Sequence, residues 1–283
     1  MEAAYWTTTV CRSARKAVRS LGIVMRSELF WAQERSRDVI PYAELDTVFL
    51  DAGNTLISMN FDWVAREFTS AGLACEAEHV RRAEAEARPA TSLHAVSEAA
   101  DGLELFRAYV GRIAVGVSAA APWGAERIAA LSATVTARLK QPGCDYRLWS
   151  WVLPGVPEAL ATLSSLGLQL AVVSNSDGSV ERALRDCGLR DHLSVVVDSD
   201  IVGFEKPDPR IFAHALEWLG ADARRTVHVG DMYFQDIEGA RGAGLHAVLL
   251  DPYSVWGGRD CDRCADLGEF ARHMSSARAS ARR

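Results

Sequence analysis

The alternation of apolar and polar positions predicts an α/β domain that is interrupted by a block of helices. Residues 47–51, TVFLD, form an apolar run that ends on a carboxylate, which predicts a buried strand. From Asp62 to about Lys140, apolar residues recur at spacings of three and four, which predicts helices without an intervening strand. After Leu153-Pro154-Gly155, helix and strand patterns alternate, as they do in a doubly wound parallel sheet.

These patterns divide the chain into a discontinuous core and an inserted helical cap. We expect the core at residues 45–58 and 151–270 and the cap at residues 59–150. Residues 1–44 are predicted to be a basic, partly disordered extension, with a targeting leader or a misassigned start at Met25 as alternatives. The small and basic residues 271–283 predict a disordered tail.

The composition is that of an ordinary soluble globular protein, with 49% hydrophobic and 24% charged residues. A net charge of −6 provides no global basic field, so we expect no nucleic-acid partner. No apolar run approaches the roughly 18 residues that cross a bilayer, so we expect no membrane association. We further expect a cytoplasmic protein that is a monomer or a homodimer. The six cysteines predict free thiols, because Cys261-x-x-Cys264 lacks two further zinc ligands nearby.

Polar side chains follow three of the predicted strands and point to chemistry at one edge of the sheet. They are Asp51, Ser174-Asn175 and Gly230-Asp231, and Lys206 lies in a loop between the last two. Ligands of parallel sheets bind at the carboxyl ends of the strands. Each residue alone could be a strand-end cap, a turn former or a helix N-cap. Their joint order and spacing favour a functional site.

Lysine is scarce in this chain, which gives Lys206 additional weight. Of 31 basic residues only Lys16, Lys140 and Lys206 are lysine, and the others are arginine. A lysine at the candidate site therefore favours a selected role for a compact ammonium charge.

Four segments of the chain together resemble the motifs of the haloacid dehalogenase-like (HAD) hydrolase superfamily. They are DAGNT at 51–55, VVSNSD at 172–177, Lys206 within GFEKPDPRIF, and GDMYFQD at 230–236. The resemblance covers roughly residues 45–255 and is strongest to the branch with a helical first cap. It implies a Rossmann-like doubly wound core with an α-helical cap inserted after the first strand.

The resemblance also implies a metal-dependent reaction on a phosphate ester. Asp51 would attack phosphorus and form an aspartyl-phosphate. Mg²⁺ would be held by Asp51, Asp231 and the backbone carbonyl of Gly53, with Asp236 supporting it through water or by ordering its neighbours.

The remaining motif residues are implied to bind the substrate phosphate. Thr55 and Ser174 would donate hydroxyl hydrogen bonds, and Asn175 would add its backbone or amide group. Lys206 would neutralise the phosphoryl group and the nucleophile together.

The sequence departs from the family pattern at Gly53, where phosphatases usually have a second Asp as general acid and base. General acid–base catalysis contributes roughly 10²- to 10⁴-fold, so its loss would slow ester cleavage. The cap could supply a replacement, for which the candidates are His79, Glu84, His94 and Tyr109. Three hypotheses remain: a phosphatase, a dehalogenase-type hydrolase that acts at carbon, and a phosphate- or partner-binding protein without turnover.

A helical cap that closes over the sheet edge limits the size of the substrate, which favours a small phosphorylated metabolite. Four cap aromatics could line the pocket, although helical spacing is more typical of bundle core. They are Trp63, Phe106, Tyr109 and Trp123. The charged segment EHVRRAEAEAR, residues 78–88, is interpreted as a solvated helix face because its acids balance its bases.

Overall fold

The computed structural model describes residues 39–97, 102–141 and 145–283. Of the extension predicted for residues 1–44, residues 1–38 lie outside the described part of the chain. From Ile40 onward the chain belongs to one compact unit, and both Ile40 and Leu45 are buried in its core.

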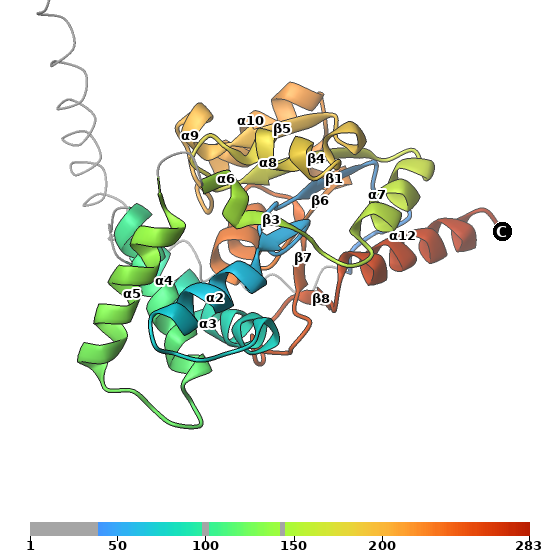
Figure 1. Ribbon diagram of the computed structural model, residues 1–283. Helices are drawn as coiled ribbons and strands as arrows, with labels where there is room; N and C mark the ends of the chain where they lie inside the picture. Colours follow the sequence, from blue (N-terminus) through green and yellow to red (C-terminus); the bar gives the residue numbers. More distant parts are fainter. Residues whose placement is uncertain (1–38, 98–101, 142–144) are drawn as a thin grey trace, which may run out of the picture. The chain divides into compact units, whose positions relative to one another are not determined.

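A six-stranded parallel sheet forms the centre of this unit (Figure 1), which confirms the predicted α/β fold with a doubly wound core. The strands lie in the order β5-β4-β1-β6-β7-β8. Their bounds are β1 Thr47–Leu50, β4 Gln169–Ser174, β5 Val195–Asp198, β6 Thr226–Gly230, β7 His246–Leu250 and β8 Asp262–Cys264. Because β1 lies between β4 and β6, the strand order reverses beside it, and this is where open α/β sheets bind ligands.

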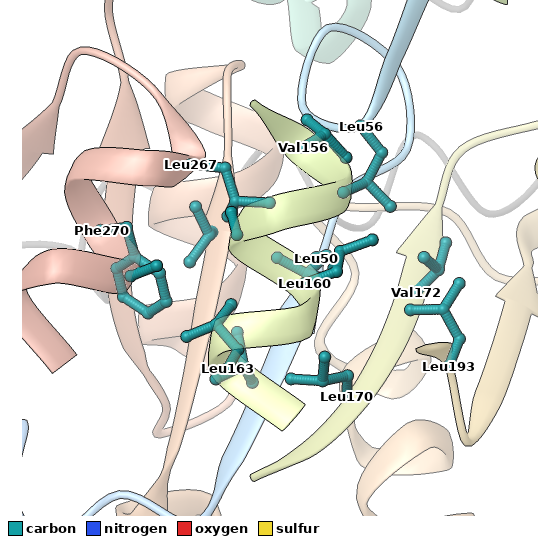
Figure 2. Close-up of a cluster of buried hydrophobic side chains, with 14 of the residues drawn as sticks. Leu50, Leu56, Val156, Leu160, Leu163, Leu170, Val172, Leu193, Leu267 and Phe270 are labelled. Atoms are coloured by element: carbon teal, nitrogen blue, oxygen red, sulfur yellow. The ribbon is translucent and has the colours of Figure 1, made fainter. Parts of the chain in front are cut away.

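Helices cover both faces of the sheet because successive strand residues point to opposite sides. Val48 and Leu50 pack with one set of helices, and Phe49 packs with the other. The flanking segments are α7 Val156–Ser165, α8 Val180–Asp186, η1 Arg190–His192, α9 Ser199–Val202, α10 Pro209–Leu219, η2 Ala223–Arg225, α11 Gly239–Gly242 and α12 Leu267–Ala281. Figure 2 shows Leu50 and Val172 of the sheet in one buried cluster with Leu160 of α7.

The C-terminal segment is helical, so the predicted disordered tail at 271–283 is wrong. Helix α12 begins after Asp266, whose side chain accepts a hydrogen bond from the backbone N–H of Glu269. Leu267, Phe270 and Met274 are buried and belong to the same core cluster as α7, as Figure 2 shows for the first two. Apolar residues spaced by three and four thus hold the helix on the sheet.

The helices predicted to form the cap lie between two short strands. Strands β2 (Ile57–Met59) and β3 (Trp149–Val152) pair antiparallel and connect the cap to the core. Between them lie α2 Phe61–Ser70, α3 Ala77–Ser97, α4 Gly102–Val117, α5 Ala125–Leu139 and α6 Asp145–Leu148. Phe68, Ile113 and Leu139 are among the buried residues of a core cluster that the cap helices share.

The segment after β6 begins with a turn that is wider than a turn of α-helix. A π-helical turn, η3 (Tyr233–Glu238), precedes the short helix α11. Gly230 is required at the start of this turn, since a Cβ atom there would lie 2.2 Å from Cγ of Asp236.

Among the described helices, none combines the length and apolarity that crossing a bilayer requires.

Candidate active site

Three buried carboxylates lie together at the carboxyl edge of the sheet. Asp51 directly follows β1 and Asp231 directly follows the neighbouring strand β6, while Asp236 projects from η3. One oxygen of each lies within 4.8 Å of the others. In the described part of the chain, this is the one group of acidic, histidine or cysteine side chains that is close enough to hold an ion.

Lys206 lies among these carboxylates and is itself buried. Its ammonium Nζ donates to Oδ1 of Asp51 at 2.6 Å and to Oδ1 of Asp236 at 2.7 Å. The loop that carries it, with a cis Lys206–Pro207 peptide, is held by Asn175. The Asn175 amide donates to the carbonyl of Lys206 at 2.9 Å, and its oxygen accepts from the Lys206 N–H at 2.7 Å. The side chain of Asn175 therefore positions Lys206. For the phosphate contact predicted for Asn175, this leaves its backbone and not its side-chain amide.

Asp236 is an organising group whose two oxygens are both engaged. Besides Lys206, its Oδ1 contacts Nε2 of His228 at 2.9 Å, and its Oδ2 accepts from the Met232 N–H at 2.8 Å. Although burial alone would raise it, Lys206 and His228 hold the pKa of Asp236 below its usual range. Burial lowers the pKa of His228, so the imidazole is neutral at neutral pH.

The cap reaches this edge through a buried polar network on α3. Arg88 forms a two-point ion pair with Glu84, with Nε to Oε1 at 2.9 Å and Nη2 to Oε2 at 2.6 Å. Its Nε also lies 3.4 Å from Oδ2 of Asp231. Glu84 accepts further hydrogen bonds from the Tyr109 hydroxyl and from the Asn54 amide, the latter at 3.0 Å. The interpretation of residues 78–88 as a solvated face is therefore wrong for Glu84 and Arg88, which are 0% and 6% exposed.

Formal charge around the site suits a divalent cation. Among the described residues, four buried carboxylates lie here and two buried cations, Lys206 and Arg88, lie beside them, so two negative formal charges stay unbalanced. The carboxylates are those of Asp51, Asp231, Asp236 and Glu84. Burial raises the pKa of Asp51 although Lys206 opposes it, and burial raises the pKa of Asp231 well above its usual range although Arg88 opposes it. Oδ2 of Asp231 accepts no hydrogen bond from the described residues, and its one ion-pair contact there is the 3.4 Å approach of Arg88 Nε. Carboxylate oxygens with this charge fit Mg²⁺.

The space beside Gly53 is occupied by an aromatic ring. A Cβ atom on Gly53 would lie 3.3 Å from Cζ3 of Trp149, 3.6 Å from its Cη2 and 3.8 Å from Oδ2 of Asp51. A side chain at position 53 would therefore point between the indole edge and the Asp51 carboxylate. Trp149 follows the cap at the start of β3, so the residue nearest to the missing acid comes from the segment that returns to the core.

The two predicted hydroxyl donors are buried close to the sheet edge. Thr55 lies in the loop that follows Asp51, and its Oγ1 has no hydrogen-bond partner among the described residues. Ser174 is the last residue of β4, the strand adjacent to β1. Buried polar groups are usually satisfied, so the bare Thr55 hydroxyl is consistent with a ligand contact.

The other cap candidates differ in their surroundings. His79 is exposed, and its Nδ1 accepts from the backbone N–H of Glu76, whereas His94 is half-buried further along α3. Tyr109 belongs to the cap core, and Phe106 and Trp123 pack against it. These three aromatics agree with the core interpretation.

Trp63 packs against the same core and also lines a cavity of about 710 Å³ between the cap and α8. Trp149 lines the same cavity, together with the side chains of Arg66 and Arg147. The volume is that of a small-molecule pocket, and its walls also contain Asp186, so they carry charges of both signs beside the aromatic rings.

The sheet order and the inserted helical cap agree with the class of hydrolase that the four sequence motifs resemble. A family model described as haloacid dehalogenase-like hydrolase matches residues 45–244. The chain belongs to this family.

Relatives in this family match the chain over part of their length. Haloacid dehalogenase-like hydrolase domain-containing protein 3 of Bos taurus is 42% identical over 99 residues, which are 35% of this chain and 39% of that protein. Glyceraldehyde 3-phosphate phosphatase of Methanothermobacter thermautotrophicus is 40% identical over 100 residues, 35% of this chain and 44% of that protein. The aligned segments thus span about two fifths of these relatives.

A solved structure shares the fold over most of the chain. The HAD-hydrolase YfnB from Bacillus subtilis, bound to magnesium, has a TM-score of 0.56 and 16% identity, and the match covers 82% of this chain and 99% of that one.

Three groups at the site were missed from the sequence: Arg88, His228 and Trp149. Arg88 follows Glu84 by four residues, a spacing that predicts an ion pair but not its burial. His228 stands inside an apolar strand, which was a usable signal for a buried polar partner. Nothing in the local pattern around Trp149 distinguishes it from other cap aromatics.

Proposed function

We propose that this protein is a Mg²⁺-dependent phosphatase that acts on a small phosphorylated metabolite. The observation that carries the proposal is the placement of Asp51 and Asp231 at adjacent strand ends with Lys206 bound to Asp51. A nucleophilic carboxylate, a second acid for a hard cation and a fixed ammonium charge are the groups that phosphoryl transfer to Asp requires.

Each residue has a definite part in this chemistry. Asp51 attacks the phosphorus atom, and Lys206 holds the carboxylate in place and offsets the incoming negative oxygens. Thr55 and Ser174 donate hydrogen bonds to phosphate oxygens, and Asp236 orders Lys206. Asp51, Asp231 and the carbonyl of Gly53 would hold Mg²⁺, which when bound offsets charge on the phosphoryl oxygens.

Phosphatase-named relatives support the same function. The names of glyceraldehyde 3-phosphate phosphatase and of phosphoserine phosphatase from Thermus thermophilus refer to small phosphate esters. A dehalogenase acting at carbon needs no cation, so the retained pair of Asp51 and Asp231 favours the phosphatase. The ammonium of Lys206 is fixed between Asp51 and Asp236, beside the nucleophile. This placement likewise favours turnover over a role in phosphate binding alone.

Hydrolysis of p-nitrophenyl phosphate by the purified full chain tests the proposal. We expect phosphate release that requires Mg²⁺, stops with EDTA and is lost in Asp51→Asn. Asp191→Asn is the matched control, because Asp191 is exposed on η1. Release of halide from 2-haloacids that EDTA does not affect would overturn the proposal, as would phosphate binding without turnover on a broad panel of esters.

A further inference from the structure

An indole ring lies beside Gly53, the position at which phosphatases of this family usually carry the acid that protonates a leaving group. The position of a Cβ on Gly53 lies 3.3 Å from the Trp149 ring and 3.8 Å from Oδ2 of Asp51. The ring atoms nearest to this position are Cζ3 and Cη2, which are carbons and carry no transferable proton.

The nearby polar groups of the cap are engaged with one another. Both oxygens of the Glu84 carboxylate are engaged as acceptors of hydrogen bonds from Arg88, Tyr109 and Asn54. The Tyr109 hydroxyl is directed at Glu84, and Asn54 in turn accepts from Ser58 at 2.6 Å. Arg88 is held between Glu84 and Asp231. Within the described residues, this network provides no general acid beside Gly53.

A phosphate ester without a general acid cleaves at a useful rate only when its leaving group is weakly basic. Protonation of an alkoxide contributes roughly 10²- to 10⁴-fold, whereas a carboxylate or a phenolate departs without a proton. We propose that Gly53 and Trp149 select acyl or aryl phosphates over alkyl phosphates, an inference that rests on the proposed phosphatase function. Trp149 is the specificity-determining side chain.

The reaction balances without a proton donor in its first step. The Asp51 carboxylate forms a bond to phosphorus, the bond from phosphorus to the bridging oxygen breaks, and the bridging oxygen keeps the electron pair as a carboxylate or phenolate anion. Water then adds to the phosphorus of the aspartyl-phosphate, both of its protons remain with the released dihydrogen phosphate, and the Asp51 carboxylate is restored.

The surroundings of Trp149 suit a leaving group that departs as an anion. The cavity of about 710 Å³ that Trp149 lines is also lined by Trp63, Arg66, Arg147 and Asp186, so its charged residues carry one more positive than negative charge. Aromatic faces accept a planar group, and arginine pairs with carboxylate oxygens.

Substrates matched in size but not in leaving group test the selection. The full chain with Mg²⁺ is assayed for phosphate release from acetyl phosphate, p-nitrophenyl phosphate, phenyl phosphate and benzyl phosphate. Benzyl phosphate resembles phenyl phosphate but releases an alkoxide. We expect its kcat/KM to be about 10²- to 10⁴-fold below that of p-nitrophenyl phosphate. Values within tenfold across the series would overturn the inference while the phosphatase function stands. Absence of Mg²⁺-dependent release from every substrate would instead overturn the proposed function.

A pair of double variants tests the reason for the selection. Gly53 does not have a positive φ, so the backbone accepts a side chain once the ring is removed. We expect Gly53→Asp with Trp149→Ala to raise kcat/KM for benzyl phosphate at least about tenfold over Gly53→Asn with Trp149→Ala. The two variants are isosteric, and only the one with Asp carries an acid. Acetyl phosphate should not distinguish them, because its acetate departs without a proton. Equal turnover of benzyl phosphate by both folded variants would overturn the role of Gly53, and the wild-type substrate series decides the selection even if the variants do not fold.

Discussion

Arg88→Met is expected to destabilise the protein strongly, because it removes one partner of a buried ion pair. The side chains of Arg88 and Glu84 are 7% and 0% exposed, and two hydrogen bonds of 2.9 and 2.6 Å join them. Although burial alone would lower it, Glu84 and Asp231 raise the pKa of Arg88, so the charge is permanent. Methionine keeps much of the side-chain volume and leaves Glu84 buried without its cation.

The expected cost follows from the uncompensated carboxylate. Removing one partner of a buried pair costs about 3–5 kcal/mol. Tyr109 and Asn54 still donate to Glu84, which favours the lower end of this range. For a domain of this size, the same change lowers the melting temperature by about 6–20 °C.

Helix α3 also provides the matched control. Arg82 and Glu86 have the same spacing and a 3.1 Å contact, but their side chains are 71% and 49% exposed. Arg82→Met should therefore cost at most about 1 kcal/mol. Thermal and urea unfolding of both variants measures the difference, and a loss in Arg88→Met no larger than in Arg82→Met would refute the reasoning.

Three further outcomes are expected. Gly230→Ala should unfold or badly distort the site, since its Cβ would lie 2.2 Å from Cγ of Asp236; a melting temperature within a degree of wild type would contradict this close packing. Lys206→Met should lower kcat/KM for p-nitrophenyl phosphate by at least about 10²-fold, because the buried ammonium contacts Asp51 and Asp236, and rates near wild type would exclude its role. Burial raises the pKa of the Cys264 thiol to about 12, so the thiol stays protonated and iodoacetamide should label it slowly at mildly alkaline pH until urea unfolds the chain; peptide mapping of rapid native labelling would contradict this.

The sequence predicted the sheet and the residues at its carboxyl edge because both depend on local signals. Continuous apolar strands ending in Asp51 and Asp231 leave little choice of fold once helices alternate with them. The helix α12 was missed, although Leu267, Phe270 and Met274 repeat at helical spacing, because the small and basic residues around them resemble a disordered tail.

The contacts between the cap and the core could not be predicted, since they depend on tertiary packing. Glu84 and Arg88 have the same spacing as the exposed pair Arg82 and Glu86, and only the docking of α3 on the core separates buried from solvated. Trp149 meets Gly53 across 96 residues of chain for the same reason. A single sequence contains no signal for such a long-range contact.

Calorimetric titration of Mg²⁺ into the purified chain tests the central claim most directly. The claim is that Asp51 and Asp231 bind a divalent cation beside Lys206, because two buried negative charges there need to be balanced. We expect saturable binding to the wild type and to Asp191→Asn, and none to Asp231→Asn. Equal binding to Asp231→Asn, or no binding to the folded wild type, would contradict the account.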